Sequence, residues 1–126
     1  MKKIIYTENA PAPIGPYSQA TLMNDTLYCS GQIALDAKTG VMVLDSIENE
    51  AQQVMKNLSA VLTAAGMRFD QVVKCSIFLR SMDDFAEVNR VYAEYFPVDP
   101  PARETVEVAR LPKDVNVEIS LIAVKG

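Results

Sequence analysis

None of the 126 residues is a histidine, so any acid–base chemistry in this chain must use other side chains. Ser-His-Asp triads, Cys-His pairs and zinc sites built on histidine are therefore excluded. Arg103 carries a planar guanidinium that can hold a carboxylate through two parallel hydrogen bonds. Glu118 lies in an alternating segment, where a carboxylate either pairs with a cross-strand cation or acts as a general base. Taken alone, Arg103 would be a solvated arginine in most proteins.

The two cysteines do not indicate a metal or redox site. Cys29 and Cys75 are isolated within apolar runs, without a Cys-x-x-Cys spacing. We expect both to be reduced and to pack in the core, and the sequence predicts no metal site.

Composition and charge limit the other classes of function. The chain carries 12 Lys and Arg residues against 16 Asp and Glu residues, without a basic cluster, which argues against nucleic-acid binding. No stretch approaches the roughly 20 apolar residues of a membrane span, and the first residues lack the apolar block of a signal peptide. We therefore expect a cytoplasmic protein with one domain, residues 1–126.

Hydrophobic periodicity predicts an α+β fold with five or six strands and two helices. Strands are expected at residues 3–6, 18–23, 26–33, 72–79, 105–108 and 115–121, where apolar and polar residues alternate or β-branched residues gather. Helices are expected at 47–65 and 85–96, where apolar residues recur every three or four positions. Two helices cover only one face of such a sheet, so the other face must meet water, a ligand or another chain.

Side-chain alternation predicts which residues occupy that open face. If Val106 and Val108 point toward the helices, then Arg103, Thr105 and Glu107 point away from them.

The same argument places Glu118 and Ser120 on the open face, because the apolar residues between them must face the helices. In residues 26–33, the open face is expected to hold Tyr28, Ser30 and Gln32. We interpret this mixed surface as an oligomer interface that contains a polar pocket.

Several motifs, in this order and at this spacing, resemble one known family. They are Ala10-Pro-Ala-Pro-Ile-Gly-Pro-Tyr-Ser-Gln-Ala20, Ser30-Gly-Gln-Ile33, Asn89-x-x-Tyr92-x-x-Tyr95-Phe96-Pro97, Pro101-Ala-Arg103, Val106-Glu-Val-Ala-x-Leu-Pro112 and Val117-Glu-Ile119. The chain resembles the Rid family of reactive-intermediate deaminases over residues 4–124. Within that family it is most similar to the RidA subgroup, the 2-iminobutanoate/2-iminopropanoate deaminases.

The resemblance implies a chorismate-mutase-like α+β domain, assembled as a homotrimer with ligand clefts between subunits. It implies hydrolysis of 2-imino acids to 2-oxo acids and ammonia without a cofactor, which protects pyridoxal-phosphate enzymes from 2-aminoacrylate. The carboxylate-binding arginine of the family matches Arg103, its water-orienting glutamate matches Glu118 and its cleft tyrosine matches Tyr17. The residues that match positions lining or supporting the cleft are Ser30, Gly31, Asn89 and Thr105, the last where the family commonly has cysteine.

Several of these residues also have structural interpretations. Tyr17 can instead cap the core, and Asn89 can cross-link backbone segments. Gly31 marks either a β-bulge or a close approach of a ligand to the backbone. We expect Thr105 to tune the pocket without abolishing activity.

Two alternative functions belong to other classes. One is a non-catalytic trimer that binds small metabolites or acts as a chaperone. The other is a ribonuclease, which the acidic charge and the absence of histidine disfavour.

Overall fold

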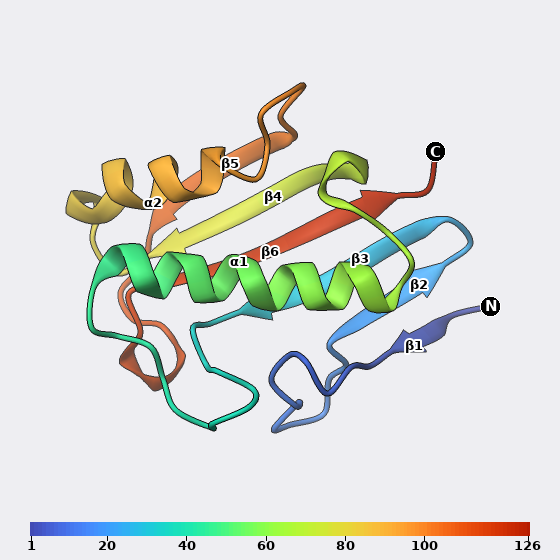
Figure 1. The fold of residues 1–126 in the computed structure, drawn as a ribbon, viewed down its shortest axis with the longest axis horizontal. Coiled ribbons are helices and arrows are strands. Elements are labelled where there is room, and N and C mark those ends of the chain that lie inside the picture. Colours follow the sequence, from blue (N-terminus) through green and yellow to red (C-terminus); the bar gives the residue numbers. More distant parts are fainter.

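The computed structural model describes residues 1–126. Its strands form a single mixed β-sheet. Its six strands follow the order β1-β2-β3-β6-β4-β5. They are β1 (Lys3–Ile5), β2 (Ala20–Met23), β3 (Thr26–Gln32), β4 (Val72–Leu79), β5 (Ala102–Glu107) and β6 (Val117–Val124). Only β4 and β5 pair in parallel, and the other neighbours are antiparallel. The long strands β3, β6 and β4 lie at the centre of the sheet (Figure 1).

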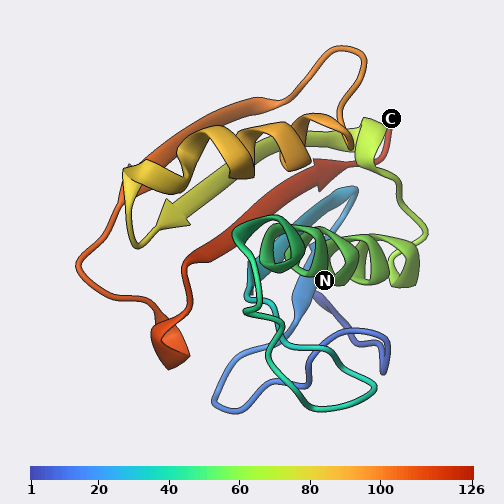
Figure 2. The ribbon, with the colours of Figure 1, turned by 60° about the vertical axis from the view of Figure 1, so that its left-hand side comes forward.

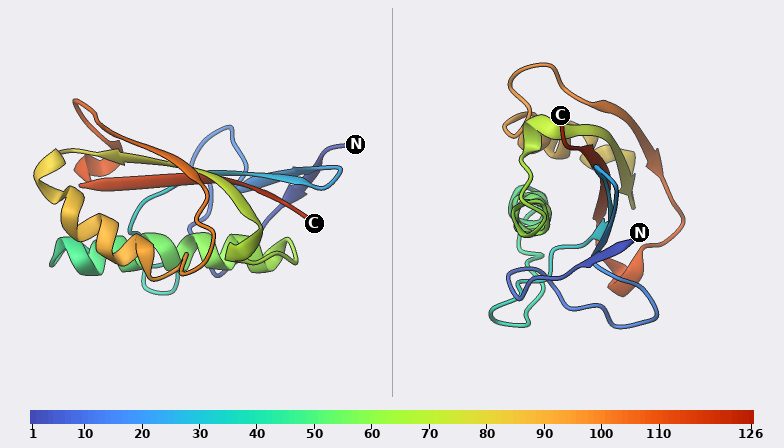
Figure 3. Two further views of the ribbon diagram at one scale, coloured as in Figure 1. Left: turned by 90° about the horizontal axis from the view of Figure 1, so that it is seen from above. Right: turned by 90° about the vertical axis from the view of Figure 1, so that its right-hand side faces the viewer.

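Both helices lie on one face of the sheet, as the sequence predicts (Figure 3). They are α1 (Ile47–Ala64) and α2 (Phe85–Ala93), and the sheet curves around α1. Short 3₁₀ helices cover Phe69–Gln71, Met82–Asp84 and Pro112–Asp114. None of the helices is both long and apolar enough to cross a bilayer.

Local signals explain where α1 begins and ends. The Ser46 hydroxyl accepts a hydrogen bond from the Asn49 N–H at 3.0 Å, which satisfies a free donor of the first turn. Gly66 follows the helix with φ +72°, a left-handed conformation that favours glycine. Between them, a stripe that includes Val54, Leu58 and Val61 is fully buried. These residues belong to a continuous core between the helices and the sheet.

The second helix is shorter than the predicted range 85–96. It ends at Ala93, and residues 94–96 continue as turns. Proline disfavours helical backbone in the residue before it, so Pro97 keeps the helix from extending through Phe96.

The loops that frame the sheet are tied down by a buried amide. The Gln19 side chain accepts from the Thr7 N–H at 2.7 Å and donates to the carbonyls of Ala10 at 3.2 Å and Pro11 at 2.8 Å. These carbonyls belong to a proline-rich loop, residues 9–17. Figure 2 shows this loop (blue) close to the loop that follows β3 (cyan). Gln19 therefore gives the proline-rich loop a fixed shape.

The predicted orientation of β5 is wrong. Val106 lies on the open face and is 41% exposed, whereas Arg103 contacts α2 on the helix face. Thr105 and Glu107 share that side with Arg103, and the Glu107 carboxylate accepts from the Met82 N–H just before α2. Because β5 is an edge strand, an aliphatic side chain there does not have to enter the core of the chain.

The predicted orientation of Gln32 is also wrong, while that of β6 is confirmed. The pairing of β3 with β6 shifts between Cys29 and Gln32, which marks a β-bulge at Ser30 and Gly31. The extra residue turns Gln32 into the core, where it is 5% exposed. Glu118 belongs to a strand whose alternate residues are buried, and it lies on the open face as predicted.

Candidate active site

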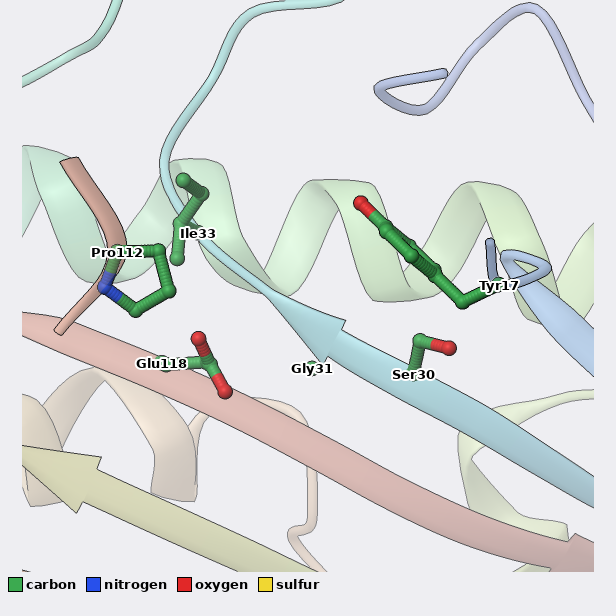
Figure 4. A pocket seen from close by; sticks show the side chains of 6 residues that line it. All are labelled: Tyr17, Ser30, Gly31, Ile33, Pro112 and Glu118. Atoms are coloured by element: carbon green, nitrogen blue, oxygen red, sulfur yellow. The ribbon is translucent and has the colours of Figure 1, made fainter. Parts of the chain in front are cut away.

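A hollow of about 420 Å³ lies on the open face, where the end of β3 runs beside β6. Its lining residues are Tyr17, Ser30, Gly31, Ile33, Pro112 and Glu118. Figure 4 shows the Glu118 carboxylate next to Gly31, with Pro112 and Ile33 on one side and Ser30 and Tyr17 on the other. Four of the predicted site residues therefore meet in one pocket.

Glu118 is the only ionisable carboxylate of this hollow. It forms none of the ion pairs of the chain, so it does not have the cross-strand partner that its position also allows. Burial raises the pKa of the Glu118 carboxyl above its ordinary value. A carboxylate that holds a proton more tightly is a stronger general base, which suits the activation of water.

Gly31 makes room for Glu118. A Cβ atom at Gly31 would lie 2.8 Å from Cδ of Glu118 and would also collide with Oε2. The φ angle of Gly31 is not positive, so space and not backbone conformation requires glycine here. The bulge at Ser30 and Gly31 brings this backbone against the carboxylate.

The other two polar residues that line the hollow are Tyr17 and Ser30. Tyr17 is 52% exposed and does not cap the core, and its hydroxyl accepts from the Ile14 N–H at 3.5 Å. The Ser30 hydroxyl donates to the Ser18 carbonyl at 2.6 Å. Ser30 thereby ties the proline-rich loop to β3 and fixes Tyr17 at the pocket.

A second cluster surrounds Arg103 on the helix face. Its guanidinium carbon lies 5.0 Å from the ring centroid of Tyr92 and 5.7 Å from that of Phe85, which are cation–π contacts. Nη1 of Arg103 donates to Oδ1 of Asn89 at 2.7 Å. These contacts fix the plane of the guanidinium and leave N–H groups free for an anion. Asn89 thus acts through Arg103.

Thr105 also belongs to the cluster around Arg103, and its hydroxyl makes no hydrogen bond within the chain. Its Oγ1 is buried, and the buried Tyr92 hydroxyl has only the Cys75 thiol, a weak partner, beside it. Burial raises the pKa of the Tyr92 hydroxyl, which stays protonated at neutral pH. These two hydroxyls near Arg103 can therefore form further hydrogen bonds with a ligand.

Both cysteines are buried and free, as the sequence predicts. Burial raises the pKa of Cys29 to about 12 and also raises that of Cys75. No group of three or more His, Cys, Asp or Glu side chains is arranged to hold a metal ion.

Within one chain the two clusters do not meet. Arg103, Asn89 and Thr105 lie on the side of the sheet that carries α2, whereas Glu118 lies on the open side. A cleft that contains both Arg103 and Glu118 therefore requires a second chain.

Two buried polar residues that shape the site, Gln19 and Glu50, were not predicted from the sequence. Gln19 orders the loop that carries Tyr17, and Glu50 is fully buried and contacts the residues before Glu118. Glu50 falls on the buried stripe of the helix, four residues before Val54. A carboxylate at an apolar helical position was the available signal.

A six-stranded mixed sheet, with two helices on one face and a carboxylate pocket on the other, defines a class of small α+β proteins. Residues 7–125 match the family model described as Endoribonuclease L-PSP. The chain belongs to this family, which includes the RutC and Rid proteins.

Two curated relatives align along nearly the whole chain. RutC family protein PH0854 of Pyrococcus horikoshii is 52% identical, with 99% of each chain covered. The mouse protein named 2-iminobutanoate/2-iminopropanoate deaminase is 47% identical, with 100% of this chain and 93% of the relative covered.

Solved structures agree with the fold. The Rid family protein YyfA of Yersinia pestis has a TM-score of 0.96 and 48% identity, covering 99% of this chain and 100% of that one. E. coli TdcF with bound serine has a TM-score of 0.94 and 38% identity, covering 98% of this chain and 99% of that one.

Proposed function

We propose that this protein is an imine deaminase that hydrolyses 2-imino acids, such as 2-iminobutanoate and 2-iminopropanoate, to 2-oxo acids and ammonia. The observation that carries the proposal is that the chain supplies two groups. One is an oriented guanidinium with free N–H groups, and the other is a half-buried carboxylate without a cation partner in the chain. The name of the mouse relative supports this substrate class. A carboxylate-bearing amino acid is bound in the TdcF structure, which supports an anchor for carboxylates.

The active site forms between two copies of the chain. Arg103 and Glu118 lie on opposite sides of the sheet, so we infer a heterologous contact, which forms a ring where the rotation between subunits closes. The family resemblance implies a ring of three. The open face supports such a contact, because several of its large apolar side chains are exposed, namely Ile4, Tyr28 and Val106.

Substrate binding relies on Arg103 of one subunit. Its guanidinium holds the substrate carboxylate through two parallel hydrogen bonds, while Asn89 keeps the plane of the fork fixed. Thr105 and Tyr92 offer hydroxyl groups beside this anchor. The imine carbon then faces Glu118 of the neighbouring subunit.

Hydrolysis proceeds by addition of water and loss of ammonia. Glu118 takes a proton from water while the water oxygen bonds to the carbon of the protonated imine, whose C=N electron pair moves to nitrogen. The proton on Glu118 then passes to the amino nitrogen of this tetrahedral intermediate. The C–N bond breaks, ammonia leaves, and loss of the hydroxyl proton gives the 2-oxo acid.

The substrates are unstable products of pyridoxal-phosphate dehydratases acting on serine or threonine. Their enamine form, exemplified by 2-aminoacrylate, attacks pyridoxal-phosphate enzymes. A modest acceleration of hydrolysis protects those enzymes, because free imines already react readily with water.

The test couples a threonine dehydratase to the protein and traps the remaining imine with semicarbazide. Arg103→Ala is expected to lower kcat/KM by about 100-fold or more, because it removes a bidentate charged anchor. Arg68→Ala is the matched control, since Arg68 is exposed and pairs only with Asp70. Undiminished loss of imine in Arg103→Ala would contradict the proposal.

The name of the matching family model raises ribonuclease activity as the competing function. The chain has a net charge of −4 and no histidine, which weighs against binding and cleaving RNA. RNA cleavage that Glu118→Gln abolishes would favour this alternative.

A further inference from the structure

A buried carboxylate outside the pocket has no part in the reaction above. The Glu50 side chain, in the first turn of α1, is 0% exposed. Its Oε2 accepts from the N–H groups of Asn116 at 2.7 Å and Val117 at 3.3 Å, and its Oε1 accepts from Nδ2 of Asn116 at 2.8 Å. No Lys or Arg pairs with it. A buried charge is costly unless hydrogen bonds compensate, and here three donors do so.

These donors belong to the residues directly before Glu118. The carbonyl of Asn116 also accepts from the Arg80 N–H at 3.0 Å, so this residue is held from two sides. Val117 is the first residue of β6, and Glu118 follows it. Because successive side chains of a strand alternate between faces, the hold on Asn116 and Val117 sets the direction of Glu118.

The loop that leads into β6 needs such a hold. Lys113 and Asp114 adopt φ of +54° and +56°, a left-handed backbone that non-glycine residues rarely adopt. Pro112, at the start of this loop, lines the pocket. Strained backbone persists only where its surroundings determine it, and the buried Glu50 carboxylate binds the end of this loop at the N–H of Asn116.

We propose that Glu50 is a positioning residue, whose buried carboxylate fixes the start of β6 so that Glu118 points into the pocket beside Gly31. This inference rests on the proposed role of Glu118 as the base. It assigns Glu50 no contact with the substrate.

The test compares Glu50→Gln with Ser46→Ala. Glu50→Gln keeps the shape of the side chain but turns one acceptor oxygen into an NH₂ group that faces N–H donors. We expect kcat to fall by roughly tenfold or more, and KM to change by less than about threefold because Arg103 lies on another surface. The fall of kcat at low pH, the acid limb of its pH profile, is expected to move to lower pH. A misplaced Glu118 is less buried, so its pKa is raised less.

Ser46→Ala is the matched control for a merely structural effect. It removes the cap of the same helix, at Asn49, without touching β6. It should lower the thermal stability while kcat and its acid limb stay unchanged. An equal loss of kcat in Ser46→Ala, or an acid limb that Glu50→Gln does not move, would overturn the proposal.

Asn116→Ala provides a second variant if Glu50→Gln fails to fold. It removes one of the three donors to Glu50 and is expected to shift the acid limb in the same direction by less. An unmoved limb in this variant would count against the proposal in the same way.

A second readout separates this inference from the proposed function. Carboxyl-carbon NMR, assigned with Glu118→Gln, measures the titration of Glu118 without any substrate. The residues that face Glu118 within the chain are uncharged, and Arg103 of the neighbouring subunit is the same in every variant. If the wild type does not hydrolyse the imine, the proposed function fails alone. A lower Glu118 pKa in Glu50→Gln than in the wild type would still support the positioning role, and an equal pKa would refute it.

Discussion

At the scale of single residues, the proposed chemistry depends on what the environment does to two charged groups. Phe85, Tyr92 and Asn89 fix the guanidinium of Arg103 before any ligand arrives. Within the chain Glu118 has no cation beside it, and burial raises its pKa. For the proposed substrate, an anchor and a base with these properties would need no histidine, because a protonated imine is itself a strong electrophile.

The raised pKa of Glu118 predicts the pH dependence of the reaction. A base must be ionised, and Glu118 takes up a proton at a higher pH than an ordinary glutamate, whose pKa is 4.5. As the pH falls, kcat should therefore decline with an apparent pKa above that value. The measurement is kcat against pH at saturating imine, so that the substrate carboxylate already occupies Arg103.

Glu118→Gln tests the assignment of this limb. It should lower kcat by about 10² to 10⁴, the usual contribution of a general base, and abolish the acid limb. An acid limb that persists unchanged in Glu118→Gln would assign it to another group.

At the scale of elements, the β-bulge of β3 and the start of β6 together build the pocket. The bulge brings the backbone of Gly31 against Glu118, and Glu50 holds the first residues of β6. A pocket built between two neighbouring strands is sensitive to shifts of less than an ångström in either one.

Gly31→Ala tests this close packing. The added methyl group would collide with the Glu118 carboxylate and push it away, so kcat should fall by about 10-fold to 100-fold. The fold should survive, because Gly31 has an ordinary φ and the carboxylate can move aside. The assay is imine trapping together with thermal unfolding.

Gly15→Ala is the control for this variant, because a methyl group there meets only the Tyr17 ring at 3.7 Å, an ordinary contact. It should keep near-wild-type kcat. A fully active Gly31→Ala protein would show that the position of the carboxylate is not critical.

Periodicity predicted the element order and the face of Glu118, because β6 is a central strand whose alternate residues must enter the core. It failed for Arg103 and Thr105, because Val106 of an edge strand turns its apolar side chain outward. The bulge that reverses Gln32 depends on pairing with β6, which the local sequence does not reveal. The site residues themselves came from the family motifs, since spacing alone does not distinguish Arg103 from a solvated arginine.

At the scale of the whole molecule, a single chain holds two incomplete halves of the proposed site. Arg103 and Glu118 lie on opposite sides of the sheet. The sheet also leaves apolar side chains such as Tyr28 and Val106 exposed on its open face. We expect sedimentation equilibrium to give three times the mass of one chain, 13.9 kDa.

Complementation between two inactive variants tests the shared site most directly. Arg103→Ala and Glu118→Gln chains are co-expressed with different tags, mixed assemblies are isolated, and imine hydrolysis is measured. In every mixed ring of three, about one third of the sites take an intact Arg103 from one chain and an intact Glu118 from the next. The mixed assemblies should therefore show about one third of wild-type activity, and activity no higher than that of the separate variants would contradict a shared site.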